Sequence, residues 1–141
     1  MAQARSNRPL SPHLQIWRWG PAMLVSILHR VTGNGLAFVG LGLLLWWVGA
    51  IASGAEAYQT FLDWVWLGTG GGIKAVTALL GKVVLVGLTW AFFQHMASGL
   101  RHFVLDIGAG YELEANALWS WFTILFGITA TVVFWAFVLL R

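Results

Sequence analysis

The stretch VVLVGLTWAFFQHMASGL, residues Val83–Leu100, contains no charged side chain over its whole length. A helix needs roughly 20 mainly apolar residues to cross the about 30 Å of hydrocarbon in a bilayer. Two further segments, Val31–Ala55 and Ala115–Leu140, are also free of charge. The chain of 141 residues is 59% hydrophobic and only 9% charged, which is unusual for a soluble domain. The sequence therefore predicts an all-α integral membrane protein with three transmembrane helices.

The polarity of the chain predicts two regions. Residues 1–20 are polar, basic and contain proline, and they lack the apolar core and the small-residue cleavage site of a signal peptide. We expect them to remain as an N-terminal segment outside the membrane. Residues 21–141 are expected to form the transmembrane domain, with spans of about 22–52, 75–104 and 115–140.

The distribution of basic residues predicts a cytoplasmic N-terminus. The connection at residues 53–72 contains Glu56 and Asp63 but no Lys or Arg, whereas basic residues flank the other ends of the first two spans. These basic residues are Arg5, Arg8, Arg18, Arg30 and Arg101. Three basic residues on the opposite side weaken the bias, and they are Lys74, Lys82 and Arg141.

The chain contains no cysteine, which excludes several kinds of site. It cannot ligate an iron–sulfur cluster, bind zinc through thiolates or form a disulfide. Any iron–sulfur chemistry must therefore come from a partner. The net charge of +3 comes from scattered basic residues, which favours contact with anionic lipid or an acidic partner over nucleic-acid binding.

A polar stripe follows one face of the second span. His95, Gly99, His102 and Asp106 are spaced i, i+4, i+7 and i+11, which is the spacing of one helix face. At about 1.5 Å per residue, His95 lies roughly 9 Å deeper than Arg101, where water cannot satisfy its imidazole. Spacing alone leaves two interpretations open. The histidine is either an axial ligand of haem b, with Gly99 leaving room for the macrocycle, or a side chain that only hydrogen-bonds a neighbouring helix.

A second polar stripe lies near the start of the first span. It has the same helical spacing and consists of Ser26, Arg30, Gly33 and Ala37. His29 is adjacent to this stripe. The depth of the stripe depends on where the helix begins. A start at Val31 places Arg30 at the headgroups, whereas a start at Pro21, a favourable first-turn residue, places it a few turns inside.

Alternating spans put the two stripes on the same side of the membrane, so they can form one site. An arginine and a serine below the interface suit the carbonyl oxygens of a quinone. They equally suit the carboxylates of haem propionates. Asp106 is expected either to balance the charge of Arg30 or Arg101 or to relay protons to a reduced quinone. An exposed ion pair at a helix end is the plainer alternative.

Three motifs occur in order along the chain: RPLSPHL at Arg8–Leu14, SILHRVTG at Ser26–Gly33 and HMASGLRHFVLD at His95–Asp106. Together with the three spans, they resemble the cytochrome b556 membrane-anchor subunit of succinate dehydrogenase, which is respiratory complex II. The third motif has the family pattern H-x-x-x-G-x-R-H-x-x-x-D at every fixed place. Trp17 stands where many relatives have tyrosine, at a position outside both stripes.

The resemblance implies a role for each polar residue. His95 is expected to be an axial ligand of a haem b iron, with the second histidine supplied by a companion three-helix anchor subunit. Ser26 and Arg30 are expected to line a ubiquinone pocket, and His29 and Arg30 to approach the haem propionates. Asp106 is expected to lie near the quinone or its proton route.

The resemblance also implies partners in a bacterial or mitochondrial inner membrane. A flavoprotein subunit would oxidise succinate, and an iron–sulfur subunit would pass the electrons to ubiquinone, so that the tricarboxylic acid cycle feeds the respiratory chain. The chain itself would not be catalytic for succinate oxidation. Two alternatives are an anchor of a fumarate reductase and a cofactor-free tether whose polar stripes only hold helices together. Few intramembrane charges and no pair of half-helices disfavour a transporter.

Overall fold

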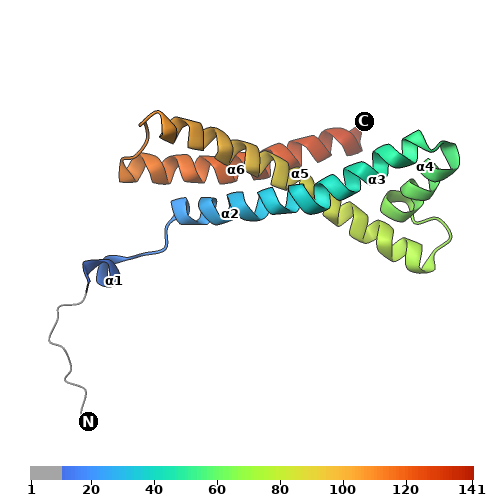
Figure 1. Cartoon of the computed structure of the whole chain (residues 1–141), viewed down its shortest axis with the longest axis horizontal. Coiled ribbons are helices and arrows are strands. Elements are labelled where there is room, and N and C mark those ends of the chain that lie inside the picture. The colour runs from blue at the N-terminus through green and yellow to red at the C-terminus, as the bar shows by residue number, and fades with distance from the viewer. Residues whose placement is uncertain (1–10) are drawn as a thin grey trace, which may run out of the picture.

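A computed structural model describes residues 11–141 and shows a helical protein (Figure 1). All regular structure in this part of the chain is helical, which confirms the predicted all-α class. Within residues 11–141, three helices are long and apolar enough to cross a membrane, as predicted. A five-residue helix, α1 (Pro12–Ile16), precedes them. Arg5, Arg8 and the beginning of the first motif lie outside the described residues.

The first span begins at Pro21, the earlier of the two starts that the sequence left open. It consists of α2 (Pro21–Gly35), one π-helical turn η1 (Leu36–Gly40) and α3 (Leu41–Ala52). The proline needs no helical partner for its missing N–H at this position. Arg30 therefore lies about 14 Å along the helix from its start, well inside the span.

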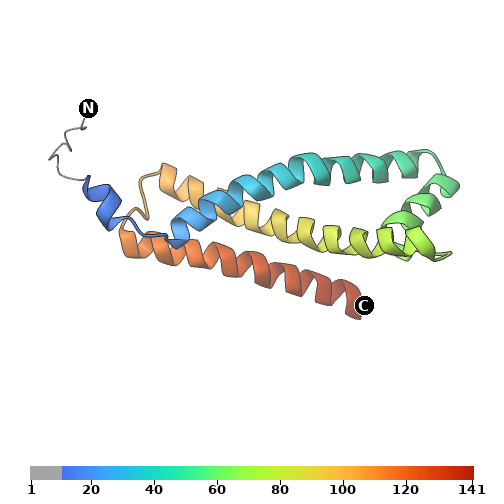
Figure 2. The same ribbon diagram turned by 90° about the horizontal axis from the view of Figure 1, so that it is seen from below.

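The second and third spans are single helices, α5 (Gly72–Asp106) and α6 (Leu113–Leu140). They begin three and two residues before the predicted spans of about 75–104 and 115–140, and α5 ends two residues later. A short connection joins them, so α5 and α6 are antiparallel neighbours (Figure 1). Near Pro21, α2 packs against both helices, whereas α3 diverges from α5 towards the far end (Figure 2).

The connection between the first two spans is helical rather than an irregular loop. It forms α4 (Ala55–Leu62) and a second π-helical turn, η2 (Asp63–Leu67), which ends at Gly68 in the left-handed conformation with φ of 70°. Turn η2 packs against α5 because Gly81 lets the backbone of Val65 approach closely. Charge patterning missed this element, since it counted only the two acidic residues of the segment.

The interior of the bundle is built from small and polar side chains. The buried polar residues include Thr32, Gln94, Ser98, Arg101, Ser120, Thr123 and Thr131. Large apolar side chains mostly point outward, as expected for a protein whose solvent is lipid. Helix contacts in lipid depend on close backbone approach and interhelical hydrogen bonds, and this interior provides both.

Candidate functional site

The two polar stripes meet where α2 crosses α5. The rings of His29 on α2 and His95 on α5 are stacked, with centroids 4.0 Å apart and planes inclined by 13°. The ring of His102 lies edge-on to His29, at a centroid distance of 5.1 Å. This arrangement confirms the prediction that the start of the first span faces the end of the second.

The hydrogen bonds of His95 define which of its nitrogens is free. Its Nδ1 lies 3.1 Å from the backbone carbonyl oxygen of His29 and 3.4 Å from the hydroxyl oxygen of Thr32. The Thr32 hydroxyl is itself 2.6 Å from the carbonyl oxygen of Leu28 and donates to it. Because a carbonyl oxygen can only accept, the proton of a neutral His95 ring is on Nδ1. Its Nε2 then carries a lone pair that can bind a metal.

Gly33 allows the His95 ring to lie against α2. A Cβ atom at position 33 would lie 2.9 Å from Cε1 of His95 and 3.2 Å from its Nδ1. Carbon atoms in optimal contact are about 3.5–4.0 Å apart, so only glycine leaves the ring in this place. Gly99 is less constrained, since a Cβ there would lie 3.9 Å from Cε1 of His29.

Ser98 holds the ring of His29 from the side of α5. Its hydroxyl oxygen is 2.7 Å from Nδ1 of His29 and 2.8 Å from the backbone carbonyl oxygen of Gln94. Ser98 is fully buried, so this hydroxyl has no water to replace either partner. Sequence spacing missed Ser98 and Thr32 because both lie off the stripes. Serine and threonine within an apolar span were the available signal.

Ser26 and Arg30 lie one turn apart on α2, beside His29. The Nη2 atom of Arg30 donates a hydrogen bond to Ser26 Oγ over 3.4 Å. The guanidinium is exposed, so it is available to a further ligand. Ala37 lies within the π-helical turn and is exposed, so the 3.6-residue spacing assumed for this stripe does not extend to it.

Asp106 is exposed at the end of α5 and forms no ion pair with Arg30 or Arg101. Within residues 11–141, the single ion pair joins Lys74 and Asp63, with 3.5 Å between Nζ and Oδ2. The structure therefore shows no direct ion pair between Asp106 and either arginine. Arg101 instead donates to the side-chain oxygen of Asn116. The histidine site consequently has a nearby cation, Arg30, and no paired carboxylate.

No cluster of three metal-ligating His, Cys, Asp or Glu side chains occurs in residues 11–141. The fold and site define a small helical membrane protein whose first two spans bring two histidines together at one end of the bundle.

Comparisons with known proteins place the chain in a family. A family model described as "Succinate dehydrogenase/Fumarate reductase transmembrane subunit" matches residues 4–134. The chain therefore belongs to this family, as its motifs indicated.

Several relatives carry closely similar names. The succinate dehydrogenase cytochrome b556 subunit of Paracoccus denitrificans is 40% identical over 110 residues, which cover 78% of this chain and 75% of the relative. The subunit of the same name from Rickettsia felis is 30% identical and covers 92% of each chain. The mouse mitochondrial succinate dehydrogenase cytochrome b560 subunit is 36% identical over 77% of this chain and 58% of its own length. The homologues are thus membrane anchors of complex II.

Proposed function

We propose that this chain is the haem b- and quinone-binding anchor of a succinate:quinone oxidoreductase. The observation that carries the proposal is the hydrogen bond from Nδ1 of His95 to the backbone carbonyl of His29. Metal-bound histidines typically donate their second ring N–H in this way, which fixes the tautomer and orients the ring. The names of the relatives, cytochromes b556 and b560, agree with a bound haem b.

The residues around His95 fit a haem. Nε2 of His95 would be one ligand of the iron, and a companion anchor subunit would supply another. His29 and the exposed Arg30 would contact the propionates, because a guanidinium matches a carboxylate through two parallel hydrogen bonds. Gly99, where a Cβ would have only one neighbour within 4 Å, leaves space against α5. When bound, the haem iron supplies one-electron redox chemistry, with a potential set by ligands and surroundings.

Ser26 and Arg30 would position the quinone. The serine hydroxyl and the guanidinium are donors for quinone oxygens, and the surrounding spans supply apolar contacts for the ring. Arg30 has no carboxylate partner in the described chain, so its positive charge would act on the haem propionates and on negative charge at a reduced quinone oxygen. Asp106 is exposed at the same end of the bundle, where it can exchange protons with water.

The remaining subunits complete this function. The chain has no cysteine, so the electrons would reach the quinone from an iron–sulfur subunit, after a flavoprotein subunit has oxidised succinate. We propose that the end of the bundle carrying Pro21 and Asp106 faces the cytoplasm of a bacterium, or the matrix if the protein is mitochondrial. This orientation brings His29, His95 and Arg30 close to soluble partners.

The haem role is tested by the visible spectrum of the purified complex. His95→Ala is expected to remove the b-type band from the reduced-minus-oxidised spectrum, because the iron loses an axial ligand. His102→Ala is the matched control, since it removes a neighbouring imidazole on the same helix and is expected to keep the band. A b-type band in His95→Ala equal to that of wild type contradicts ligation of the haem iron by His95.

The quinone role is tested by electron transfer to two acceptors. Arg30→Leu is expected to reduce succinate-to-quinone turnover, while reduction of an artificial acceptor at the flavin is unchanged. Arg141→Leu, at the opposite end of the bundle, is expected to leave both activities unchanged. Equal quinone reduction by Arg30→Leu and wild type ends this part of the proposal.

A further inference from the structure

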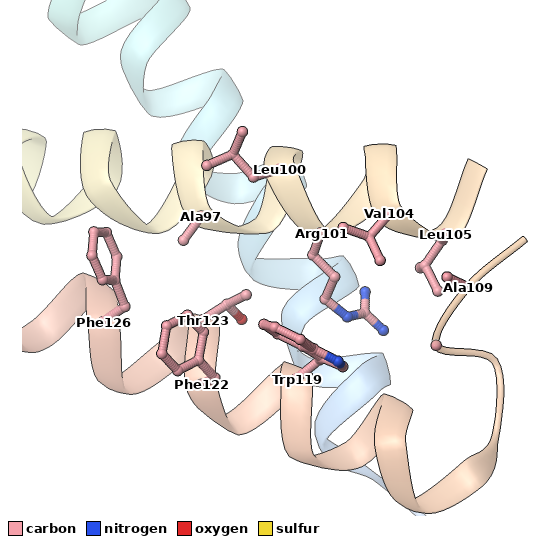
Figure 3. A pocket seen from close by; sticks show the side chains of 11 residues that line it. Ala97, Leu100, Arg101, Val104, Leu105, Ala109, Trp119, Phe122, Thr123 and Phe126 are labelled. Atoms are coloured by element: carbon pink, nitrogen blue, oxygen red, sulfur yellow. The ribbon is translucent and has the colours of Figure 1, made fainter. Parts of the chain in front are cut away.

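A cavity lies between α5 and α6, away from the histidines. It has a volume of about 220 Å³ and is lined from α5, α6 and the connection between them, with no residue from α2 (Figure 3). Its walls are mainly apolar and include Ala97, Val104, Trp119, Phe122 and Phe126. The one charged side chain in this wall is Arg101. The side chain of Arg101 lies between the two helices, near Trp119 (Figure 3).

Arg101 is a buried cation with incomplete partners. Arg101 is only 9% exposed, and its Nη2 donates a hydrogen bond to the side-chain oxygen of Asn116. Its Nε is buried and has no hydrogen-bond partner. The acidic residues nearest in sequence are exposed, and none forms an ion pair with Arg101: Asp106, Glu112 and Glu114. A charge buried in a transmembrane segment is costly without a partner, so this site calls for an anion.

The cavity limits the shape of the molecule that brings this anion. Sites that enclose a whole small molecule have volumes of about 300–1,000 Å³, so this cavity can hold only part of a larger apolar molecule, such as a segment of an acyl chain. Arg101 precedes the end of α5 by five residues, or about 7.5 Å along the helix, a distance similar to the thickness of the headgroup region of a bilayer. An apolar chain and an anionic group at this depth are the two parts of a phospholipid.

We propose that this cavity binds an anionic phospholipid, with one acyl chain between α5 and α6 and the phosphate on the guanidinium of Arg101. Basic pockets between transmembrane helices bind anionic headgroups, and arginine matches phosphate oxygens with parallel hydrogen bonds. An acidic side chain of a partner subunit would also neutralise Arg101. Such a side chain would leave the apolar cavity empty, so the lipid accounts for more of the site.

The experiment uses the intact complex, purified with its partner subunits and equilibrated with equal amounts of phosphatidylglycerol and phosphatidylcholine. Native mass spectrometry then counts the lipids that stay bound. Wild type is expected to retain phosphatidylglycerol in preference to phosphatidylcholine by about fivefold, as one cation near the membrane surface provides. Arg101→Gln is expected to lose this preference. Arg141→Gln, an exposed arginine at the far end of the bundle, is expected to keep it.

A second variant keeps the charge and blocks the cavity. Val104 lines the cavity and is 38% exposed, so Val104→Trp is expected to fill the opening, to preserve the fold and to lower retention of both lipids. Val104→Trp therefore still tests whether the cavity binds lipid if the complex with Arg101→Gln does not assemble. The proposal is overturned if wild type shows no preference for phosphatidylglycerol, or if either cavity variant retains lipid as wild type does. A partner carboxylate found on Arg101 in the assembled complex would equally overturn it.

Discussion

Replacing Gly33 by alanine tests the contact that places the His95 ring. The new Cβ would lie 2.9 Å from Cε1 of His95, about 0.6 Å closer than the shortest comfortable carbon contact. Both Gly33 and the carbonyl that accepts from Nδ1 belong to α2. A movement of the ring away from α2 by this amount lengthens the hydrogen bond to the His29 carbonyl from 3.1 Å to about 3.7 Å, beyond the range of a hydrogen bond.

The expected result is weaker haem binding by a correctly assembled complex. Loss of a hydrogen-bond partner behind a metal-bound histidine lowers metal affinity by about 10–100-fold. The ratio of haem to flavin in the purified complex, measured from the reduced-minus-oxidised spectrum, is expected to fall accordingly. Overpacking at the crossing of α2 and α5 is also expected to cost about 1–3 kcal/mol, which lowers the apparent Tm whether or not haem is present.

Gly35→Ala is the matched control for this prediction. It lies on the same helix, and a Cβ at position 35 has no neighbour within 4 Å. Both substitutions improve helix propensity by about 0.5–1 kcal/mol, so they differ mainly in the contact with His95. If Gly33→Ala retains as much haem as Gly35→Ala and melts at the same temperature, the proposed constraint on the ring is wrong.

Two other predictions concern packing of the bundle. Gly81→Ala is expected to destabilise the complex by about 1–3 kcal/mol, because its Cβ would overlap the backbone of Val65, whereas Gly87→Ala has open space and is expected to have no such effect on Tm. A Tm for Gly81→Ala equal to that of Gly87→Ala would contradict this contact. Gln94 is fully buried and neither of its amide atoms has a partner, so Gln94→Met is expected to raise the apparent Tm, corresponding to about 1 kcal/mol. A lower Tm for Gln94→Met would show that the amide has an important partner in the assembled complex.

Helical spacing and charge were sufficient to predict the three spans and the face of α5 that meets α2. These features depend on local periodicity, which a sequence contains directly. The stripe through His95 and His102 was therefore found correctly, and both rings lie near His29. The start at Pro21 remained open because the residues between Pro21 and Arg30 are compatible with either a membrane or an interfacial position.

Contacts between helices were not predictable from periodicity. The stacking of His29 on His95 depends on how far α2 is rotated about its own axis and how closely Gly33 lets α5 approach. The contacts of Ser98 with His29 and of Thr32 with His95 likewise join α2 to α5, so the spacing along either helix does not reveal them. The missing pair between Asp106 and the arginines has the same origin, because spacing along one helix does not fix how far a side chain lies from a neighbouring helix.

The π-helical turn at Leu36–Gly40 determines how far α3 is rotated about the helix axis relative to α2. Such a turn holds one residue more than an α-helical turn, and each residue of an α-helix advances the chain by about 100°. Deleting Phe38, which is exposed, would restore an unbroken α-helix and rotate Leu41–Ala52 by about that angle relative to Pro21–Gly35. Helix α3 would then turn a different face towards α4, while His29 and His95 would keep their positions where α2 crosses α5. Deletion of one residue in this turn would thus change the orientation of a whole helix, even though the deleted side chain is exposed.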